Sequence, residues 1–329
     1  MDTHELLQKI TTLPIAAEGL ADDMLAGNFR SVFKGQGMEF DEARHYQWGD
    51  DVRSIDWNAS ARFGTPFVKM YREERELTIM ILLDTSASMR REAFARFSPP
   101  GGGSGGERLS PYEQGIITAA LIAFSAERGG QRVGAFLFDR EIERVFPPRK
   151  GRRHTMALIS GALQYQNLKN PRHGRTGTQD RAERQSAVQS SNLRAALTGA
   201  GRLLKRRSMV VLISDFLSVN WEHELAELSR RHDVIAIRIT GPLDNELPDL
   251  GLIAMEDPET LRRITAATGY ASFRDAWTQW HRERGELWLN LCRRSGAAFL
   301  EISTDANAAP ALFHFFGAGR PHSGHRERQ

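Results

Sequence analysis

The stretch LTIMILLDTSASM, Leu77–Met89, decides the fold. Its first seven residues are apolar except for one threonine, which is typical of a strand buried on both faces of a parallel sheet. The apolar run ends at Asp84, and serines follow at every second position, at Ser86 and Ser88. This strand end is either an ordinary turn or a set of three oxygen ligands, because Asp and Ser are common in both.

The rest of the chain after this stretch alternates between strand and helix patterns. Further strands are expected at 132–138, 142–146, 208–214, 233–240 and 297–303. Helices are expected at 111–127, 154–166, 192–204, 221–231, 272–296 and 308–316. Several strands are apolar on both faces, so we predict an α/β fold with a doubly wound, mostly parallel sheet covered by helices on both sides.

The chain before residue 77 reads differently, with two strand-like segments at 29–40 and 64–74 that flank a charged, aromatic stretch. Its polarity predicts a small subdomain. The expected division is an N-terminal β-containing subdomain over 1–76, an α/β domain over 77–317 and a disordered tail over 318–329. Within the α/β domain, the polar or glycine-rich segments 97–110 and 170–191 are expected to be irregular.

Composition narrows the classes of function. The chain has 329 residues, with 44 Lys+Arg against 41 Asp+Glu, a net charge of +3 that does not indicate a nucleic-acid partner. The single cysteine, Cys292, lies in an apolar helix pattern and is expected to be a buried, inert thiol. The polar N-terminus and the absence of an apolar run of about 18 residues predict a cytoplasmic protein without a signal peptide or membrane span.

Polar side chains gather where the predicted strands end. Asp84, Ser86 and Ser88 follow one strand, and Ser214 and Asp215 end another. The helix that begins near residue 192 is preceded by Ser190 and Ser191. In an open parallel sheet, ligands bind at the carboxyl ends of the strands. Oxygen donors without His or Cys favour a hard cation, namely Mg²⁺, Mn²⁺ or Ca²⁺.

Three of these segments, LLDTSASM, SSNLRAAL and VLISDF, resemble the loops of a von Willebrand factor A-type domain with a metal-ion-dependent adhesion site. Upstream, GQGMEFDEARHYQWGDDVRSIDWNASAR resembles the signature of the bacterial domain of unknown function 58 family. The later GLIAMEDPETLRR and LFHFFGAGR fit the same family, so the resemblance extends from about Gly35 to Arg320.

The resemblance implies a role for each residue of the site. Ser86 and Ser88 would bind the cation directly, and Asp84 and Asp215 would bind it directly or through water. At the second loop the family pattern is Gly-Thr-Asp-Leu, so Ser191 takes the place of the threonine and Asn192 that of the aspartate. The expected metal ligands are therefore Asp84, Ser86, Ser88, Ser191 and Asp215, with no catalytic residue.

The same resemblance implies a binding function. A Glu or Asp of a partner protein would complete the coordination of Mg²⁺, and relatives of this family are found with MoxR-type AAA+ ATPases, which implies an adaptor or chaperone-like factor. The alternative is a metal-activated hydrolase, a phosphatase or esterase, that uses Asp84 and Asp215. No G-x-S-x-G motif surrounds Ser86 or Ser88, and the glycine-rich GGGSGGER lacks the Gly-Lys-Ser/Thr ending of a P-loop.

Two further patterns are open to a structural interpretation. The stretch RHYQWGDDVRSIDW is either a second contact surface or a compact turn with Arg–Asp pairs and a buried Trp57. A stripe at helical spacing is expected to pack in the core and consists of Phe273, Trp277, Trp280, Leu287 and Leu291.

Overall fold

The computed structural model describes Leu20 and residues 39–48, 50–51, 54–72, 77–90, 109–169, 192–256, 259 and 262–317. The chain forms two compact units, a smaller one of Phe29–Glu76 and a larger one that includes everything from Leu77 onward. Leu20 belongs to the larger unit, where it is completely buried. The predicted boundaries 1–76 and 77–317 stay predictions, and the predicted tail 318–329 and most of segments 97–110 and 170–191 lie outside the described residues.

The smaller unit contains an antiparallel pair of strands, β1 (Glu39–His45) and β2 (Phe67–Arg72), and a short helix, α2 (Trp57–Phe63). The helix was not expected. Asp56 is the N-cap of this helix, and its side chain accepts from two backbone amides. Gly64 is the C-cap, with a φ of 69° that favours glycine. Arg44 and Asp50 form a two-point ion pair with distances of 2.7 and 2.8 Å. Trp57 is 68% exposed, so the smaller unit does not bury it by itself.

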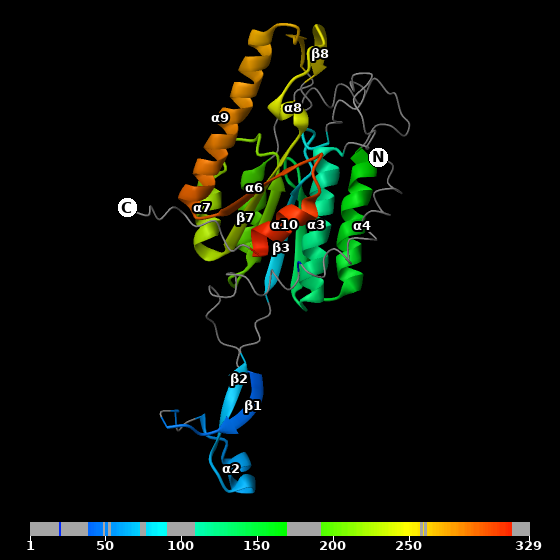
Figure 1. Ribbon diagram of the computed structural model, residues 1–329. Helices are drawn as coiled ribbons and strands as arrows, with labels where there is room; N and C mark the ends of the chain where they lie inside the picture. Colours follow the sequence, from blue (N-terminus) through cyan, green and yellow to red (C-terminus); the bar gives the residue numbers. More distant parts are fainter. Residues whose placement is uncertain are drawn as a thin grey trace, which may run out of the picture. The chain divides into compact units, whose positions relative to one another are not determined.

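A six-stranded sheet forms the centre of the larger unit (Figure 1). The strand order is β10-β7-β6-β3-β4-β5, and every neighbouring pair is parallel except β4 and β5. The predicted mostly parallel sheet is therefore confirmed. The strands are β3 (Thr78–Asp84), β4 (Arg132–Phe138), β5 (Ile142–Arg149), β6 (Met209–Ser214), β7 (Asp233–Thr240) and β10 (Ala298–Ser303).

Helices cover both faces of this sheet, as the doubly wound fold requires (Figure 1). One face is covered by α3 (Pro111–Arg128), α4 (Arg152–Lys169) and α10 (Ala308–Gly317). The other is covered by α6 (Leu193–Leu203), α7 (Glu222–Arg231) and α9 (Ala271–Ser295). Ser110 and Glu113 form a capping box at the start of α3, with Pro111 in its first turn.

The central strand β3 packs against helices on both sides. Met80 and Leu82 belong to the apolar cluster that includes residues of α6, α7 and α9. Leu83 faces α3, where a Cβ on Gly115 would lie 3.1 Å from Leu83 Cδ1. The small residue therefore lets α3 approach the end of β3 closely, and this contact helps to fix the strand end that precedes Ser86 and Ser88.

The stretch between β7 and α9 is more regular than expected. It contains a short helix, α8 (Pro242–Asn245), and an antiparallel hairpin of β8 (Leu252–Glu256) and β9 (Arg263–Ala267). Within the described residues, no helix is both long enough and apolar enough to cross a membrane.

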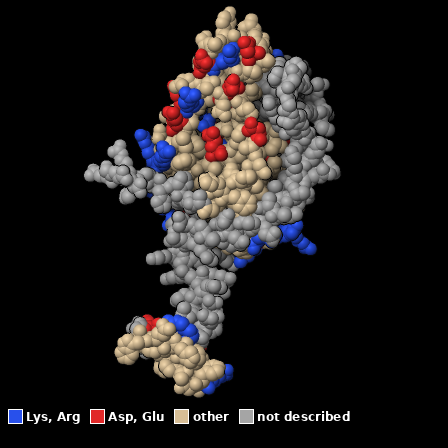
Figure 2. Space-filling view, viewed as in Figure 1, with Lys and Arg blue, Asp and Glu red and all other residues tan. Residues whose placement is uncertain are grey.

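The predicted core stripe on α9 is wrong for Trp280 and Leu287, which are 46% and 62% exposed, whereas Leu291 packs against the core as expected. The residues that α9 buries are instead His281, Trp288 and Cys292. The expectation of a buried cysteine is confirmed. The upper part of the larger unit in Figure 2 presents interspersed charges of both signs rather than a patch of one sign.

Candidate metal centre

The candidate site lies at the point where the direction of winding in the sheet reverses. β3 and β6 are neighbours, yet β4 follows β3 on one side and β7 follows β6 on the other. Ligands of open α/β sheets bind in the crevice outside the carboxyl ends of two such strands. Asp84 is the last residue of β3, Ser214 is the last of β6, and Asp215 follows directly.

Asp84 is completely buried, and hydrogen bonds hold both of its carboxylate oxygens. The Ser214 hydroxyl donates to Oδ2 over 2.6 Å, and the Ser86 amide donates to Oδ1 over 2.9 Å. The Ser86 and Ser88 hydroxyl oxygens lie 3.0 Å apart. Thr85 turns away, with its hydroxyl donating to the Phe138 carbonyl. The alternating serines therefore present two adjacent oxygens beside the Asp84 turn.

Asp215 is 4% exposed. Its Oδ1 accepts from the Leu217 amide over 3.1 Å, whereas its buried Oδ2 has no hydrogen-bond partner in the described structure. The next residue, Phe216, has a φ of 55°, an uncommon backbone conformation for a bulky side chain. Its ring packs against Trp221 and Trp288, with centroids 5.4 and 5.5 Å away. Aromatic packing thus stabilises the turn that positions an unpartnered carboxylate oxygen.

The electrostatics of the two carboxylates favour a cation. Burial, and then the negative charge of Asp215, raise the pKa of Asp84 to about 7, against the hydrogen bonds from Ser214 and Ser86. Arg284 lies near, but its guanidinium donates to the Phe216 and Leu217 carbonyls, over 3.3 and 2.8 Å. Burying two carboxylates together is unfavourable unless a positive charge compensates them.

The donor set fits a hard cation held mainly by hydroxyls and water. Across the described residues, no three His, Cys, Asp or Glu side chains are grouped so that they could share a metal. The direct protein ligands would therefore include the Ser86 and Ser88 hydroxyls. Mg²⁺ takes six oxygen ligands and usually keeps several waters, so an incomplete protein shell suits it.

The second predicted loop is described only in part. Ser191 lies outside the described residues, so its role as a ligand stays a prediction. Asn192 is exposed and acts as the N-cap of α6, with its Oδ1 accepting from the Ala195 amide over 3.0 Å. The backbone N–H of Asn192 donates to the Asp139 carbonyl over 2.7 Å. The start of α6 is thus tied to the loop that follows β4, the neighbour of β3.

Two residues at the site were missing from the predicted ligand set. Ser214 was recognised only as a strand end, yet its hydroxyl orients Asp84. The Glu259 carboxylate accepts from the Ser88 amide over 2.9 Å, across a separation of 171 residues. The sequence offers one indication of Ser214, namely its hydroxyl directly before Asp215. It offers none of Glu259, which has no metal-binding spacing to its neighbours in the sequence.

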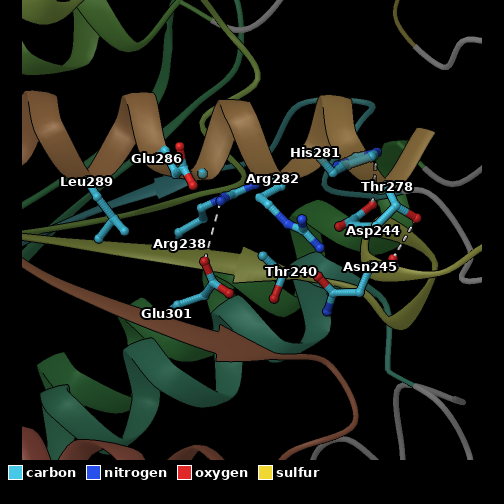
Figure 3. A pocket seen from close by; sticks show the side chains of 11 residues that line it. Arg238, Thr240, Asp244, Asn245, Thr278, His281, Arg282, Glu286, Leu289 and Glu301 are labelled. Atoms are coloured by element: carbon cyan, nitrogen blue, oxygen red, sulfur yellow. Dashed lines mark hydrogen bonds and ion pairs between the residues drawn. The ribbon is translucent and has the colours of Figure 1, made fainter. Parts of the chain in front are cut away.

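A separate polar pocket lies between β7, α8, α9 and β10, with a volume of about 320 Å³ (Figure 3). Its lining includes the buried Arg238, whose Nη1 lies 3.4 Å from Glu301 Oε2, and His281, whose Nε2 lies 4.0 Å from Asp244 Oδ1. Acidic and basic groups are thus both present, so the lining indicates no preferred ligand charge.

Sequence comparison finds a family and several relatives. The family model "Protein of unknown function DUF58" matches residues 42–286. An uncharacterized protein of Mycobacterium tuberculosis and one of Mycobacterium bovis are each 30% identical to this chain over 261 residues, which cover 79% of this chain and 73% of the relative.

Solved structures with some similarity include an aerotolerance-related membrane protein of Bacteroides fragilis, at 16% identity and a TM-score of 0.40, over 72% of this chain and 94% of that one. The SpRpn10 VWA domain matches at 11% identity and a TM-score of 0.31, over 76% of this chain and all (100%) of that one. At these scores the fold assignment rests on the strand order and helix layers of the chain itself.

Proposed function

We propose that this chain, which belongs to the DUF58 family of proteins of unknown function, is a metal-dependent protein-interaction module. The supporting observation is that Asp84, Ser86, Ser88 and Asp215 lie together at the carboxyl ends of β3 and β6. The buried Oδ2 of Asp215 has no hydrogen-bond partner among the described residues. Cations of the Mg²⁺ type, including Mn²⁺ and Ca²⁺, match this oxygen donor set.

In this proposal the residues divide into ligands and orienting groups. The Ser86 and Ser88 hydroxyls, with Ser191, would hold the cation directly, and Asp84 and Asp215 would hold it directly or through water. The Ser214 hydroxyl and the Ser86 amide keep the Asp84 carboxylate in one orientation. When bound, the cation would supply a coordination position that accepts a carboxylate oxygen.

Binding is favoured over hydrolysis by the state of Asp84. A nucleophilic or basic carboxylate must reach its substrate or water, whereas Asp84 is completely buried with hydrogen bonds to both oxygens. Phosphatase or esterase turnover that is lost in Asp84→Ala would contradict this argument and favour the hydrolase alternative.

The proposed partner is a protein that offers an acidic residue to the cation. The family resemblance suggests that a MoxR-type AAA+ ATPase takes part and that the chain acts as a cytoplasmic adaptor or chaperone-like factor. Co-precipitation of such an ATPase with the tagged chain is expected in Mg²⁺ and is expected to be lost in EDTA and in Asp84→Asn. Equal recovery in Mg²⁺ and EDTA would contradict the metal dependence.

Metal binding itself is tested by thermal melting. A ligand that binds only the folded state stabilises it by RT ln(1 + [L]/Kd), about 2.7 kcal/mol at 100 times Kd. Mg²⁺ or Mn²⁺ should therefore raise the melting temperature of the wild type and of Asp275→Ala, an exposed control on α9. Asp84→Asn should remove the rise, measured against its own metal-free melting temperature, because the Asn side chain has only one of the two acceptor oxygens that Ser214 and Ser86 bind. A rise of equal size in Asp84→Asn would exclude the site.

A further inference from the structure

The hairpin of β8 and β9 brings an acidic side chain into contact with Ser88 of the candidate site. Glu259 lies in the connection between these strands, and its Oε1 accepts from the Ser88 amide over 2.9 Å. Ser88 is one of the two hydroxyl residues assigned to the cation, and its hydroxyl lies 3.0 Å from that of Ser86. The Glu259 carboxylate is therefore adjacent to the hydroxyl pair.

The opposite end of this hairpin is fixed to the body of the larger unit. The Thr268 hydroxyl lies within hydrogen-bond distance of the Gly251 carbonyl, at 2.9 Å, and of the Leu250 amide, at 3.1 Å. Arg274 of α9 donates to the Thr268 carbonyl over 2.6 Å. These bonds tie the first and last residues of the hairpin together and to α9, so the hairpin is anchored at the end opposite Glu259.

The Glu259 carboxylate is partly buried, and the negative charges of Asp139 and Asp215 act on it. Asp215 is also the residue whose buried Oδ2 lacks a partner. The chain thus places one carboxylate directly beside Ser88 of the hydroxyl pair, within the electrostatic reach of Asp215.

We infer that Glu259 is an internal ligand of the cation, an inference that rests on the proposed function. In the free protein its carboxylate would replace one water beside Ser86 and Ser88 and so occupy the coordination position that a partner's Glu or Asp takes. The partner must then displace Glu259, which makes the hairpin an autoinhibitory element of the binding site. The exchange is one of ligands only and involves no covalent step.

The test uses Mn²⁺ as the probe and the full chain. Glu259→Gln keeps an oxygen that accepts from the Ser88 amide but removes the charge, and Glu227→Gln on α7 is the matched control at an exposed position. Water-proton relaxation of bound Mn²⁺ counts its exchangeable waters. Glu259→Gln should increase this relaxation relative to the wild type and weaken Mn²⁺ binding on the order of tenfold. Glu227→Gln should leave both unchanged.

Acetate serves as a probe for the freed position. It should lower the relaxation of Mn²⁺ bound to Glu259→Gln and have little effect on the wild type, where Glu259 already fills the position. Glu259→Asp keeps the charge but is one methylene shorter, and it should behave like Glu259→Gln. It serves as the second test variant if Glu259→Gln does not fold.

The outcomes separate the two proposals. If the wild type binds Mn²⁺ and Glu259→Gln matches it in affinity, relaxation and acetate response, Glu259 is only a structural acceptor for Ser88 and the internal-ligand inference is wrong. If the wild type does not bind Mn²⁺, or Asp84→Asn binds it equally well, the metal centre itself is wrong and the inference fails with it.

Discussion

Ser214 is the residue that most directly controls Asp84, because its hydroxyl makes a 2.6 Å hydrogen bond to Oδ2 inside the protein. It also accepts from the Phe216 amide over 3.0 Å and so links the two strand ends to the turn that contains Asp215. A serine at this position thus couples the orientation of both candidate carboxylates, although it is not proposed to contact the cation.

We expect Ser214→Ala to lower the free energy of unfolding of the metal-free protein by about 1–3 kcal/mol, since a buried carboxylate loses a hydrogen bond. Urea unfolding measures this. Ser218→Ala is the matched control, because Ser218 is also buried but its hydroxyl has no partner among the described residues, and its loss should change little. Equal effects of the two substitutions would contradict the role of Ser214.

At this scale the sequence could indicate Asp84, Ser86 and Ser88, because residues two apart in an extended turn face the same way. Asp215 could also be predicted from the sequence, because it directly follows a buried strand. Ser214 could not be separated from an ordinary strand end, because only the fold shows that its hydroxyl meets Asp84 across 130 residues. Glu259 needed the hairpin geometry, which no short pattern reveals.

Among the elements, α6 begins at Asn192, where the resemblance described above implies an aspartate. The exposed Asn192 side chain caps the helix. Asparagine and aspartate are comparable N-caps, so the helix start does not depend on the missing charge.

Asn192→Ala should therefore lower the free energy of unfolding by about 1 kcal/mol, because the Ala195 amide loses its acceptor. Asn192→Asp should keep the cap and add about 0.3–1 kcal/mol through the favourable charge at a helix N-terminus. Chemical unfolding of the three proteins at low ionic strength checks the order. A stability of Asn192→Ala equal to the wild type would show that the cap is unimportant.

The elements that the sequence predicted are those with long apolar periods. Except for the edge strand β5, the strands of the central sheet are apolar along most of their length, and the helices that cover them are long enough to show an apolar face. α2, α8 and the β8–β9 hairpin are short, and α2 and the hairpin are largely exposed, so burial left no long pattern in their residues. Trp280 and Leu287 of the α9 stripe were mispredicted for a related reason, since a surface helix also places apolar residues at its exposed edge.

For the whole molecule, pH provides a test of burial that does not involve the metal centre. His232, at the end of α7, is 4% exposed, and burial followed by the charge of Arg231 lowers its pKa, with Arg207 adding to this and Asp233 opposing it. The folded state therefore binds fewer protons than the unfolded state, in which the pKa of histidine is about 6.5.

Because the unfolded state binds more protons, the stability due to neutral His232 is fully present above about pH 6.5 and is lost as the pH falls below it. The wild type should accordingly lose more stability than His232→Gln between about pH 7 and about pH 5, as measured by urea unfolding at each pH. Parallel stability curves for the two proteins would mean that His232 does not resist protonation in the folded state.

The central claim, that the ends of β3 and β6 hold a divalent cation, is tested most directly by anomalous diffraction from crystals soaked in Mn²⁺. The predicted result is a manganese peak at coordination distance from the Ser86 and Ser88 hydroxyls, beside Asp84 and Asp215. The contradicting result is well-ordered density for these four side chains in the Mn²⁺-soaked crystal with no manganese peak between them.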